Sequence, residues 1–210
     1  MTIANVGTRG PRPAIFLDKD GTLIDDVPYN VDPARVRLTR GAREGAAALQ
    51  AAGYALVVVT NQSGVARGLF APDALLAVRA RIEALLGRGF DGFYWCPHYP
   101  AGAVHEYAIV CGCRKPQPGL LTRAAGELGL DLARSWMIGD ILSDVEAGCR
   151  AGCRTALLGA VPDAPPLEPQ RTPTLVASDL GEAARRILGL SQSKPGERSA
   201  CDEPRPVPRA

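Results

Sequence analysis

Short apolar runs alternate with helical patterns along most of this chain, and this alternation restricts the possible fold more than any other feature of the sequence. Six runs read as buried strands, at residues 13–18, 54–61, 91–98, 135–140, 153–158 and 174–177. Five helical patterns lie between or after them, at residues 41–52, 72–86, 118–128, 143–151 and 179–189. Strands that alternate with helices predict an α/β fold, a Rossmann-like parallel sheet with helices on both faces.

One domain is expected to account for most of the chain. A length of 210 residues favours a single domain with a sizeable core, which we assign to residues 13–190. Residues 1–12 are expected to be flexible, and residues 191–210 are rich in proline and charge, which predicts a disordered tail. The first segment lacks the apolar core of a signal peptide, and the apolar run at residues 55–59 is too short to span a bilayer. We therefore expect a cytoplasmic protein with no membrane partner.

The charge of the chain gives little support to a nucleic-acid partner. The formal net charge is +2, and the 24 basic residues are scattered along the chain. Nucleic-acid binding domains instead concentrate their basic residues on one face or along one helix.

Polar side chains follow three of the predicted strands. Asp18 and Asp20 follow the first strand, Thr60 and Asn61 end the second, and Asp140 ends the strand at residues 135–140. One aspartate after a strand is usually a turn residue or a helix cap, but three strand ends of this kind are hard to assign to turns alone. In an open parallel sheet ligands bind beyond the carboxyl ends of the strands, so these residues predict a site at one edge of the sheet.

The local sequences are more specific than this layout. DKDGT at residues 18–22, VVVTN ending at Asn61, Lys115 in the frame CRKPQPG, and GDILSD at residues 139–144 resemble four motifs of the haloacid-dehalogenase superfamily, in the expected order. The resemblance covers roughly residues 13 to 160 and implies the haloacid-dehalogenase fold. The short span between the first motif and the next helix leaves no room for a large cap domain there.

The resemblance also implies a chemistry. Asp18 would be the nucleophile that forms an aspartyl phosphate, and Asp20 would be the general acid and base. Thr60 would bind phosphate oxygens, and Lys115 would counter the charge of the transition state. A Mg²⁺ ion, which prefers oxygen ligands, would be held by Asp18, Asp20 through its backbone carbonyl, and Asp140. Asp144 is open to two interpretations, either a residue that supports this site from behind or a carboxylate in the first turn of a helix.

Four residues form a C-x-H and C-x-C pair that brackets a loop at residues 96–113. Three sulfurs and one imidazole suit a closed tetrahedral site, so Cys96, His98, Cys111 and Cys113 predict a structural Zn²⁺. The alternative is a set of scattered buried cysteines with a satisfied histidine. His105 lies inside this zinc loop, and we expect it to be exposed.

The zinc loop narrows the range of possible substrates. Its long gap between ligand pairs resembles the D-glycero-D-manno-heptose 1,7-bisphosphate phosphatases, whereas the related histidinol-phosphate phosphatases have a shorter gap. The resemblance implies hydrolysis of the 7-phosphate in nucleotide-activated heptose and surface polysaccharide biosynthesis. It implies substrate contacts from residues in three segments, Asp26, Val27, Pro28 and Tyr29, then Thr60, Asn61, Gln62 and Ser63, and finally Arg114 and Lys115. Arg67 is a weaker candidate. Ile141 stands where relatives often have lysine, a difference that bears on which anomer is used.

Three other functions remain to be weighed. One is a histidinol-phosphate phosphatase, and another is a phosphatase acting on nucleic-acid ends, which no basic or aromatic binding segment supports. From another class comes a catalytically silent, zinc-clipped binding module, which would be expected to lack Asp18, Asp20 or Asp140. All three are present. We therefore expect a monomeric enzyme whose partner is a small sugar bisphosphate.

Overall fold

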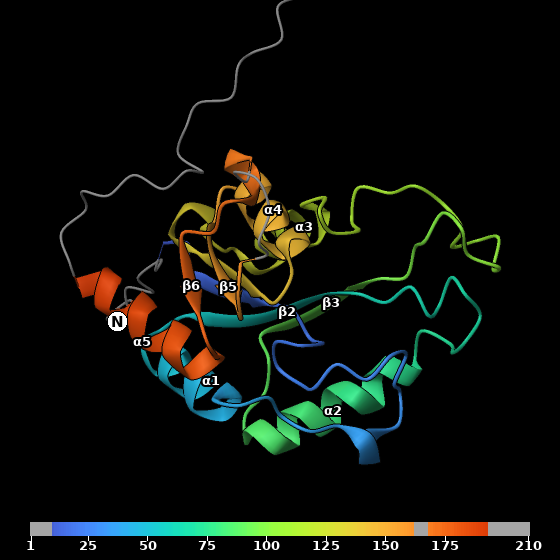
Figure 1. Ribbon diagram of the computed structural model, residues 1–210, viewed down its shortest axis with the longest axis horizontal. Helices are drawn as coiled ribbons and strands as arrows, with labels where there is room; N and C mark the ends of the chain where they lie inside the picture. Colours follow the sequence, from blue (N-terminus) through green and yellow to red (C-terminus); the bar gives the residue numbers. More distant parts are fainter. Residues whose placement is uncertain (1–9, 162–167, 193–210) are drawn as a thin grey trace, which may run out of the picture.

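A six-stranded parallel sheet forms the centre of the molecule (Figure 1). The computed structural model describes residues 10–161 and 168–192. The strands are β1 (Ala14–Leu17), β2 (Ala55–Asn61), β3 (Gly92–Cys96), β4 (Trp136–Gly139), β5 (Arg154–Leu158) and β6 (Leu175–Ala177). Their order across the sheet is β3-β2-β1-β4-β5-β6, and each neighbouring pair is parallel.

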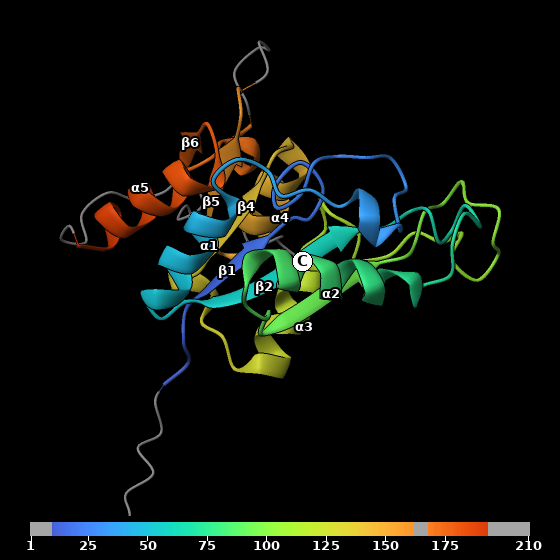
Figure 2. The same ribbon diagram turned by 90° about the horizontal axis from the view of Figure 1, so that it is seen from below.

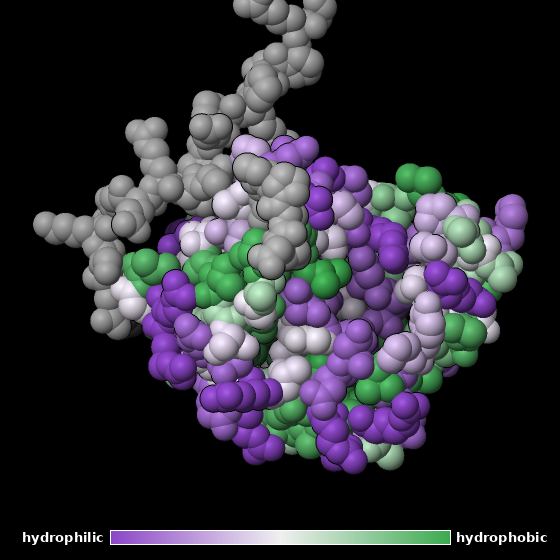
Figure 3. All heavy atoms as spheres, viewed as in Figure 1, coloured by the Kyte–Doolittle hydropathy of each residue, from purple (hydrophilic) through white to green (hydrophobic). Residues whose placement is uncertain are grey.

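Helices cover both faces of the sheet, as predicted (Figures 1 and 2). One face packs against α1 (Ala42–Ala51), α2 (Ala74–Leu86) and α5 (Leu180–Gln192), and the other against α3 (Gly119–Leu128) and α4 (Leu142–Ala151). On the side seen in Figure 3, hydrophilic and hydrophobic residues are mixed over the helices at the bottom of the picture. Such mixing is expected of helices that turn one side to the core and the other to water.

The alternation of side chains along β1 explains why the sheet needs two helical layers. Ile15 and Leu17 point into the core shared with α1, α2 and α5, whereas Ala14 and Phe16 point into the core shared with α3 and α4. All four are fully buried. Successive residues of a strand face opposite sides of the sheet, so an uninterrupted apolar run requires apolar cover on both.

The predicted elements agree with the structure to within a few residues. Three short 3-10 helices were not predicted, at Pro33–Arg35, Leu132–Arg134 and Pro169–Arg171. Residues 1–9 and 193–210, most of the two predicted flexible ends, lie outside the described residues. Near the boundaries that are described, Arg12 forms an ion pair with Asp91, and α5 continues to Gln192. No helix within residues 10–161 and 168–192 has the length and apolar character needed to cross a bilayer.

The strand order determines where a ligand can bind. The chain builds outward from β1 to β2 and β3, and then crosses to the other side of β1 to continue with β4. The connections therefore diverge at the carboxyl ends of β1 and β4 and leave a crevice there. Within the described part of the chain no cap domain covers this edge, as predicted. The loop that follows β2 and the loop that follows β3 are joined by a hydrogen bond, in which the Val104 amide donates to the Ala66 carbonyl over 2.8 Å.

The helix α4 depends on a glycine for its close approach to the sheet. A Cβ atom on Gly148 would lie 2.5 Å from Cβ of Met137 and 2.8 Å from Cγ2 of Thr155, so nothing larger than glycine fits without movement of α4 or the sheet. Gly126 also lies within a helix, α3, but a Cβ there would meet no atom within 4 Å.

These two glycines allow a matched test of packing. We expect Gly148→Ala to lower the free energy of unfolding by about 1–3 kcal/mol, because overpacking strains the core. Gly126→Ala should raise it by about 0.5–1 kcal/mol, because alanine loses less backbone entropy in a helix. Urea unfolding of both variants measures this, and equal effects would contradict the close packing of α4.

Candidate active site

The predicted residues gather around a cavity at the carboxyl ends of β1, β2 and β4. The cavity has a volume of about 310 Å³. Asp18, Thr60 and Asp140 line it; Asp18 follows β1, Thr60 is the second-last residue of β2, and Asp140 follows β4. The parallel sheet thus brings together side chains that are far apart in the sequence.

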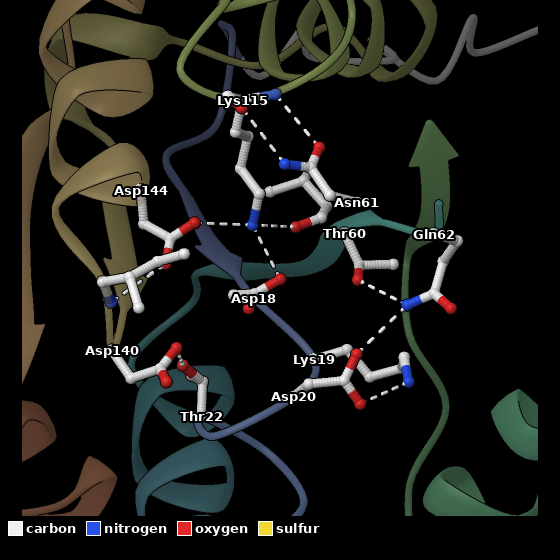
Figure 4. Close-up of polar contacts among 12 residues, drawn as sticks. Asp18, Lys19, Asp20, Thr22, Thr60, Asn61, Gln62, Lys115, Asp140 and Asp144 are labelled. Carbon is white, nitrogen blue, oxygen red and sulfur yellow. Dashed lines mark hydrogen bonds and ion pairs between the residues drawn. The ribbon is translucent and has the colours of Figure 1, made fainter. Parts of the chain in front are cut away.

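Lys115 lies at the centre of the site (Figure 4). Its ammonium group Nζ is 2.6 Å from Oδ1 of Asp18 and 2.6 Å from Oδ1 of Asp144, and it donates to the Val59 carbonyl over 2.9 Å. Burial opposes the charged form of this lysine, but the carboxylates of Asp144 and Asp18 outweigh burial and raise the pKa of Lys115. Lys115 is therefore a permanent buried cation in contact with the candidate nucleophile.

Asp144 both supports the site from behind and lies in the first turn of a helix, so the two interpretations of the sequence apply together. It lies in the first turn of α4, where its Oδ2 accepts a hydrogen bond from the Ile141 amide over 3.3 Å, and its Oδ1 pairs with Lys115. Burial raises the pKa of Asp144 to about 7, against the opposing effect of Lys115. With both oxygens engaged, Asp144 holds the lysine from behind.

Asp140 approaches the first motif because Gly21 has no side chain. Gly21 adopts a left-handed conformation with φ of 73°, and a Cβ there would lie 2.1 Å from Oδ2 of Asp140. Burial and the nearby Asp18 raise the pKa of Asp140 to about 6. One carboxylate oxygen each from Asp18, Asp140 and Asp144 lie within 4.8 Å of one another. Such a group of oxygen ligands fits a hard divalent cation.

The carboxylate of Asp20 does not belong to that group, and both of its oxygens are bound by other side chains. Its Oδ1 accepts from Nζ of Lys19 at 2.6 Å, and its Oδ2 accepts from Nε2 of Gln62 at 3.1 Å. The same Gln62 nitrogen lies 2.9 Å from Oγ1 of Thr60. Burial raises the pKa of Asp20, and Lys19 opposes this shift.

Most of the predicted substrate residues line the cavity. They are Asp26, Val27, Pro28, Tyr29, Thr60, Asn61, Gln62, Ser63 and Lys115. Asn61 also contacts the backbone of Lys115 twice, since its Oδ1 accepts from the Lys115 amide at 3.0 Å and its Nδ2 donates to the carbonyl at 3.1 Å. Sequence reasoning missed Lys19, Asn30 and Gly64 as lining residues. Only Lys19 had a usable signal, its position between two motif aspartates.

Arg114 lies outside this cavity, at its rim. Its Nη1 donates to the His98 carbonyl over 3.3 Å, and its Cζ lies 5.3 Å from the centre of the Tyr99 ring. Cζ of Arg67 lies 4.3 Å from the same ring and 5.9 Å from the ring of Tyr29, which lines the cavity. Among the described residues neither arginine forms an ion pair with a carboxylate, and both guanidinium groups lie near the Tyr99 ring.

The four predicted zinc ligands form a compact group. Sγ of Cys113 is 3.2 Å from Sγ of Cys96, 3.3 Å from Sγ of Cys111 and 3.2 Å from Nδ1 of His98. Sulfurs bound tetrahedrally to zinc at about 2.3 Å are separated by roughly 3.8 Å, so the cluster is compatible with a zinc ion after a small expansion. His105 is exposed and outside the cluster, as expected.

The buried ion pairs of Lys115 lead to a prediction for stability. We expect Lys115→Met to lower the free energy of unfolding by about 3–5 kcal/mol without added magnesium, because it leaves the carboxylates of Asp18 and Asp144 buried without a cation. Adding Asp144→Asn should restore part of this loss. Urea unfolding provides the measurement, with Arg123→Met as a control. Arg123 pairs with Glu127 on the surface, and its loss should cost less than about 1 kcal/mol. An equal loss in the single and double variants would argue against the pairing.

Comparison with known proteins agrees with this geometry. A HAD-hydrolase-like family model matches residues 112–183. The D-glycero-beta-D-manno-heptose-1,7-bisphosphate 7-phosphatase of Photorhabdus laumondii is 38% identical over 86% of this chain and 97% of its own length. The Escherichia coli K12 protein of the same name is 44% identical over 64% of this chain and 72% of its own.

A solved structure is similar over nearly its whole length. The D,D-heptose 1,7-bisphosphate phosphatase of B. bronchiseptica, in complex with magnesium and phosphate, has a TM-score of 0.69 and 31% identity over 85% of this chain and 99% of its own. Because similarity at this level extends over most of both chains, the chain belongs to the D-glycero-beta-D-manno-heptose-1,7-bisphosphate 7-phosphatase family of HAD-like hydrolases.

Proposed function

We propose that this protein is a phosphatase that hydrolyses the 7-phosphate of D-glycero-D-manno-heptose 1,7-bisphosphate and releases heptose 1-phosphate. It would act in the synthesis of nucleotide-activated heptose for surface polysaccharide. The observation that carries the proposal is the group formed by Asp18, Lys115 and Asp140 in a cavity open to small molecules. The printed names of the relatives support the choice of substrate.

The residues divide the reaction into two steps. An oxygen of Asp18 attacks phosphorus, the bond from phosphorus to the C7 oxygen breaks, and protonated Asp20 gives its proton to that oxygen. The Asp20 carboxylate then takes a proton from water, whose oxygen attacks phosphorus. The bond to Asp18 breaks, and phosphate leaves. Lys115 offsets negative charge on the phosphoryl group and on Asp18, and Thr60 donates to a phosphoryl oxygen.

A magnesium ion fits the acidic side of this cavity. Asp18 and Asp140 would hold it with the backbone carbonyl of Asp20, while Asp144 remains engaged with Lys115. When bound, the ion would neutralise negative charge on the phosphoryl group. The magnesium and phosphate in the B. bronchiseptica structure support this assignment.

The rim arginines support a substrate with a second phosphate. Arg114 would bind the distal phosphate, where a planar guanidinium can make two parallel hydrogen bonds, and Arg67 lies close enough to assist it. The lining residues Asp26 to Tyr29 and Thr60 to Ser63 would contact the sugar. Ile141, which is 52% exposed at the cavity wall, would contact the sugar with an apolar side chain and influence the choice of anomer.

The zinc loop and the wider context complete the proposal. Zinc at Cys96, His98, Cys111 and Cys113 would be structural, since four protein ligands leave no open position. The working unit would be the domain of residues 13–190, acting as a cytoplasmic monomer without nucleic-acid or membrane partners.

Phosphate release by the purified protein tests the proposed function. With magnesium present, we expect strong preference for one anomer of heptose 1,7-bisphosphate over the other and over histidinol phosphate. Asp18→Asn should abolish turnover because an amide cannot form the acyl phosphate. Preference for histidinol phosphate would keep the mechanism and overturn the substrate. Absence of turnover with every substrate would favour a binding module instead.

Zinc removal provides a second test. We expect the purified protein to contain about one zinc ion per chain, as measured by inductively coupled plasma mass spectrometry. Cys113→Ser should lose most of it, melt at a lower temperature and be cut by protease within residues 97–112. Cys153→Ser is the matched control, because Cys153 is a buried cysteine outside the cluster. Retention of zinc in Cys113→Ser would contradict the ligand assignment.

A further inference from the structure

Lys19 is a buried cation to which the mechanism above gives no task. The residue is only 2% exposed, and its Nζ forms an ion pair of 2.6 Å with Asp20. Burying an ammonium group is costly unless it is paired, so a lysine here needs a compensating role. Since the carboxylate that it contacts is the candidate acid and base of the reaction, that role is to be sought at Asp20.

Asp20 is held from two sides. Lys19 binds one carboxylate oxygen and Gln62 binds the other, and Gln62 is in turn fixed by Thr60 at the end of β2 (Figure 4). A carboxylate with a fixed partner on each oxygen has little freedom to rotate. The orientation of Asp20 is therefore set by side chains from two strand ends.

The local backbone does not provide this restraint by itself. The backbone of Asp20 forms a β-bridge with Ile24, directly before a turn that begins at Gly21, but this bridge leaves the side chain of Asp20 free to rotate. It is also close to a group of carboxylates that can hold a cation, those of Asp18, Asp140 and Asp144. A freely rotating Asp20 side chain could join that group and bind the cation, and it would then no longer face the leaving oxygen. The ion pair with Lys19 and the hydrogen bond from Gln62 oppose this rotation of the Asp20 side chain.

We propose that Lys19 is a positioning residue that, together with Gln62, holds the Asp20 carboxylate in the orientation needed to protonate the leaving group. The inference rests on the proposed phosphatase chemistry but not on the identity of the sugar. Misplacement of a catalytic group by about 1 Å can cost on the order of a hundredfold in rate. The need for such an acid depends on the leaving group, because an alkoxide must be protonated as it departs whereas a nitrophenolate is stable without a proton.

The test compares first-turnover rates of two substrates in Lys19→Met. With a sugar phosphate, leaving-group release measured by rapid quench should slow by about a hundredfold or more, in the range that general acid catalysis contributes. With p-nitrophenyl phosphate, the burst of nitrophenol should slow by less than about tenfold. Lys19→Arg, which keeps the cation, should recover part of the sugar-phosphate rate. Arg123→Met, which removes an exposed cation, should change neither.

Two measurements separate positioning from other roles. In an Asp20→Asn background, Lys19→Met should cause no further loss with the sugar phosphate, because residues that act as a unit are not additive. A full additional loss there would mean that Lys19 acts directly on the substrate and would overturn the inference. Equal slowing of both substrates, with an unchanged urea midpoint, would also overturn it. The sugar phosphate in this comparison is the one that the unaltered protein hydrolyses fastest, so a wrong choice of heptose would change that substrate and leave the comparison intact.

Discussion

The buried ammonium group of Lys115 is the interaction on which the rest of the site depends. It joins Asp18 at the end of β1 to Asp144 in α4 and to the carbonyl of Val59 in β2, so one cation connects three elements. A lone charge would be too costly at this depth, but two carboxylates and a carbonyl offset its burial. Asn61 adds two hydrogen bonds to the lysine backbone, which fix the loop that carries it. The charge needed to balance a phosphoryl group is therefore in place before any substrate arrives, and no reorganisation is required during reaction.

Much of the fold could be predicted because its signals are local. The apolar runs are uninterrupted since both faces of the sheet are buried, and glycine or proline marks the ends of most helices. The motif aspartates could also be predicted to meet, because parallel strands present their carboxyl ends at one edge. The Cys/His cluster could be predicted from two short pairs of residues, C-x-H and C-x-C. These features depend on sequence spacing alone, which is why they could be read without a structure.

Features that depend on side-chain direction could not be predicted in the same way. Arg114 lies between Cys113 of the Cys/His cluster and Lys115, yet its side chain lies beside Tyr99 while Lys115 is buried. Asn61 lines the cavity as predicted for a substrate residue, and its side-chain amide also forms two hydrogen bonds with the Lys115 backbone. Lys19 is a charged residue that the sequence gives no reason to bury. In each case the deciding factor is the direction of a side chain toward one particular partner, Tyr99 for Arg114, Lys115 for Asn61 and Asp20 for Lys19, and such a direction leaves no periodic trace in the sequence.

The Cys/His cluster holds the two ends of the loop at residues 96–113, whereas the segment between them is tied to the rest of the protein through the hydrogen bond from Val104 to Ala66. His98 and Cys111 are held in one cluster, and Cys113 is followed at once by Arg114 and Lys115. Residues 99–110 between them approach the rim of the cavity, where Tyr99 stacks on Arg67. Insertions, deletions or exchanges in this middle segment would thus alter the surface near Tyr99, while the Cys/His cluster and the contacts of Lys115 keep the two ends in place. The twelve residues at 99–110 could therefore be exchanged as a unit between two anchored ends. Such an exchange offers a route by which the range of substrates could change in evolution or by design.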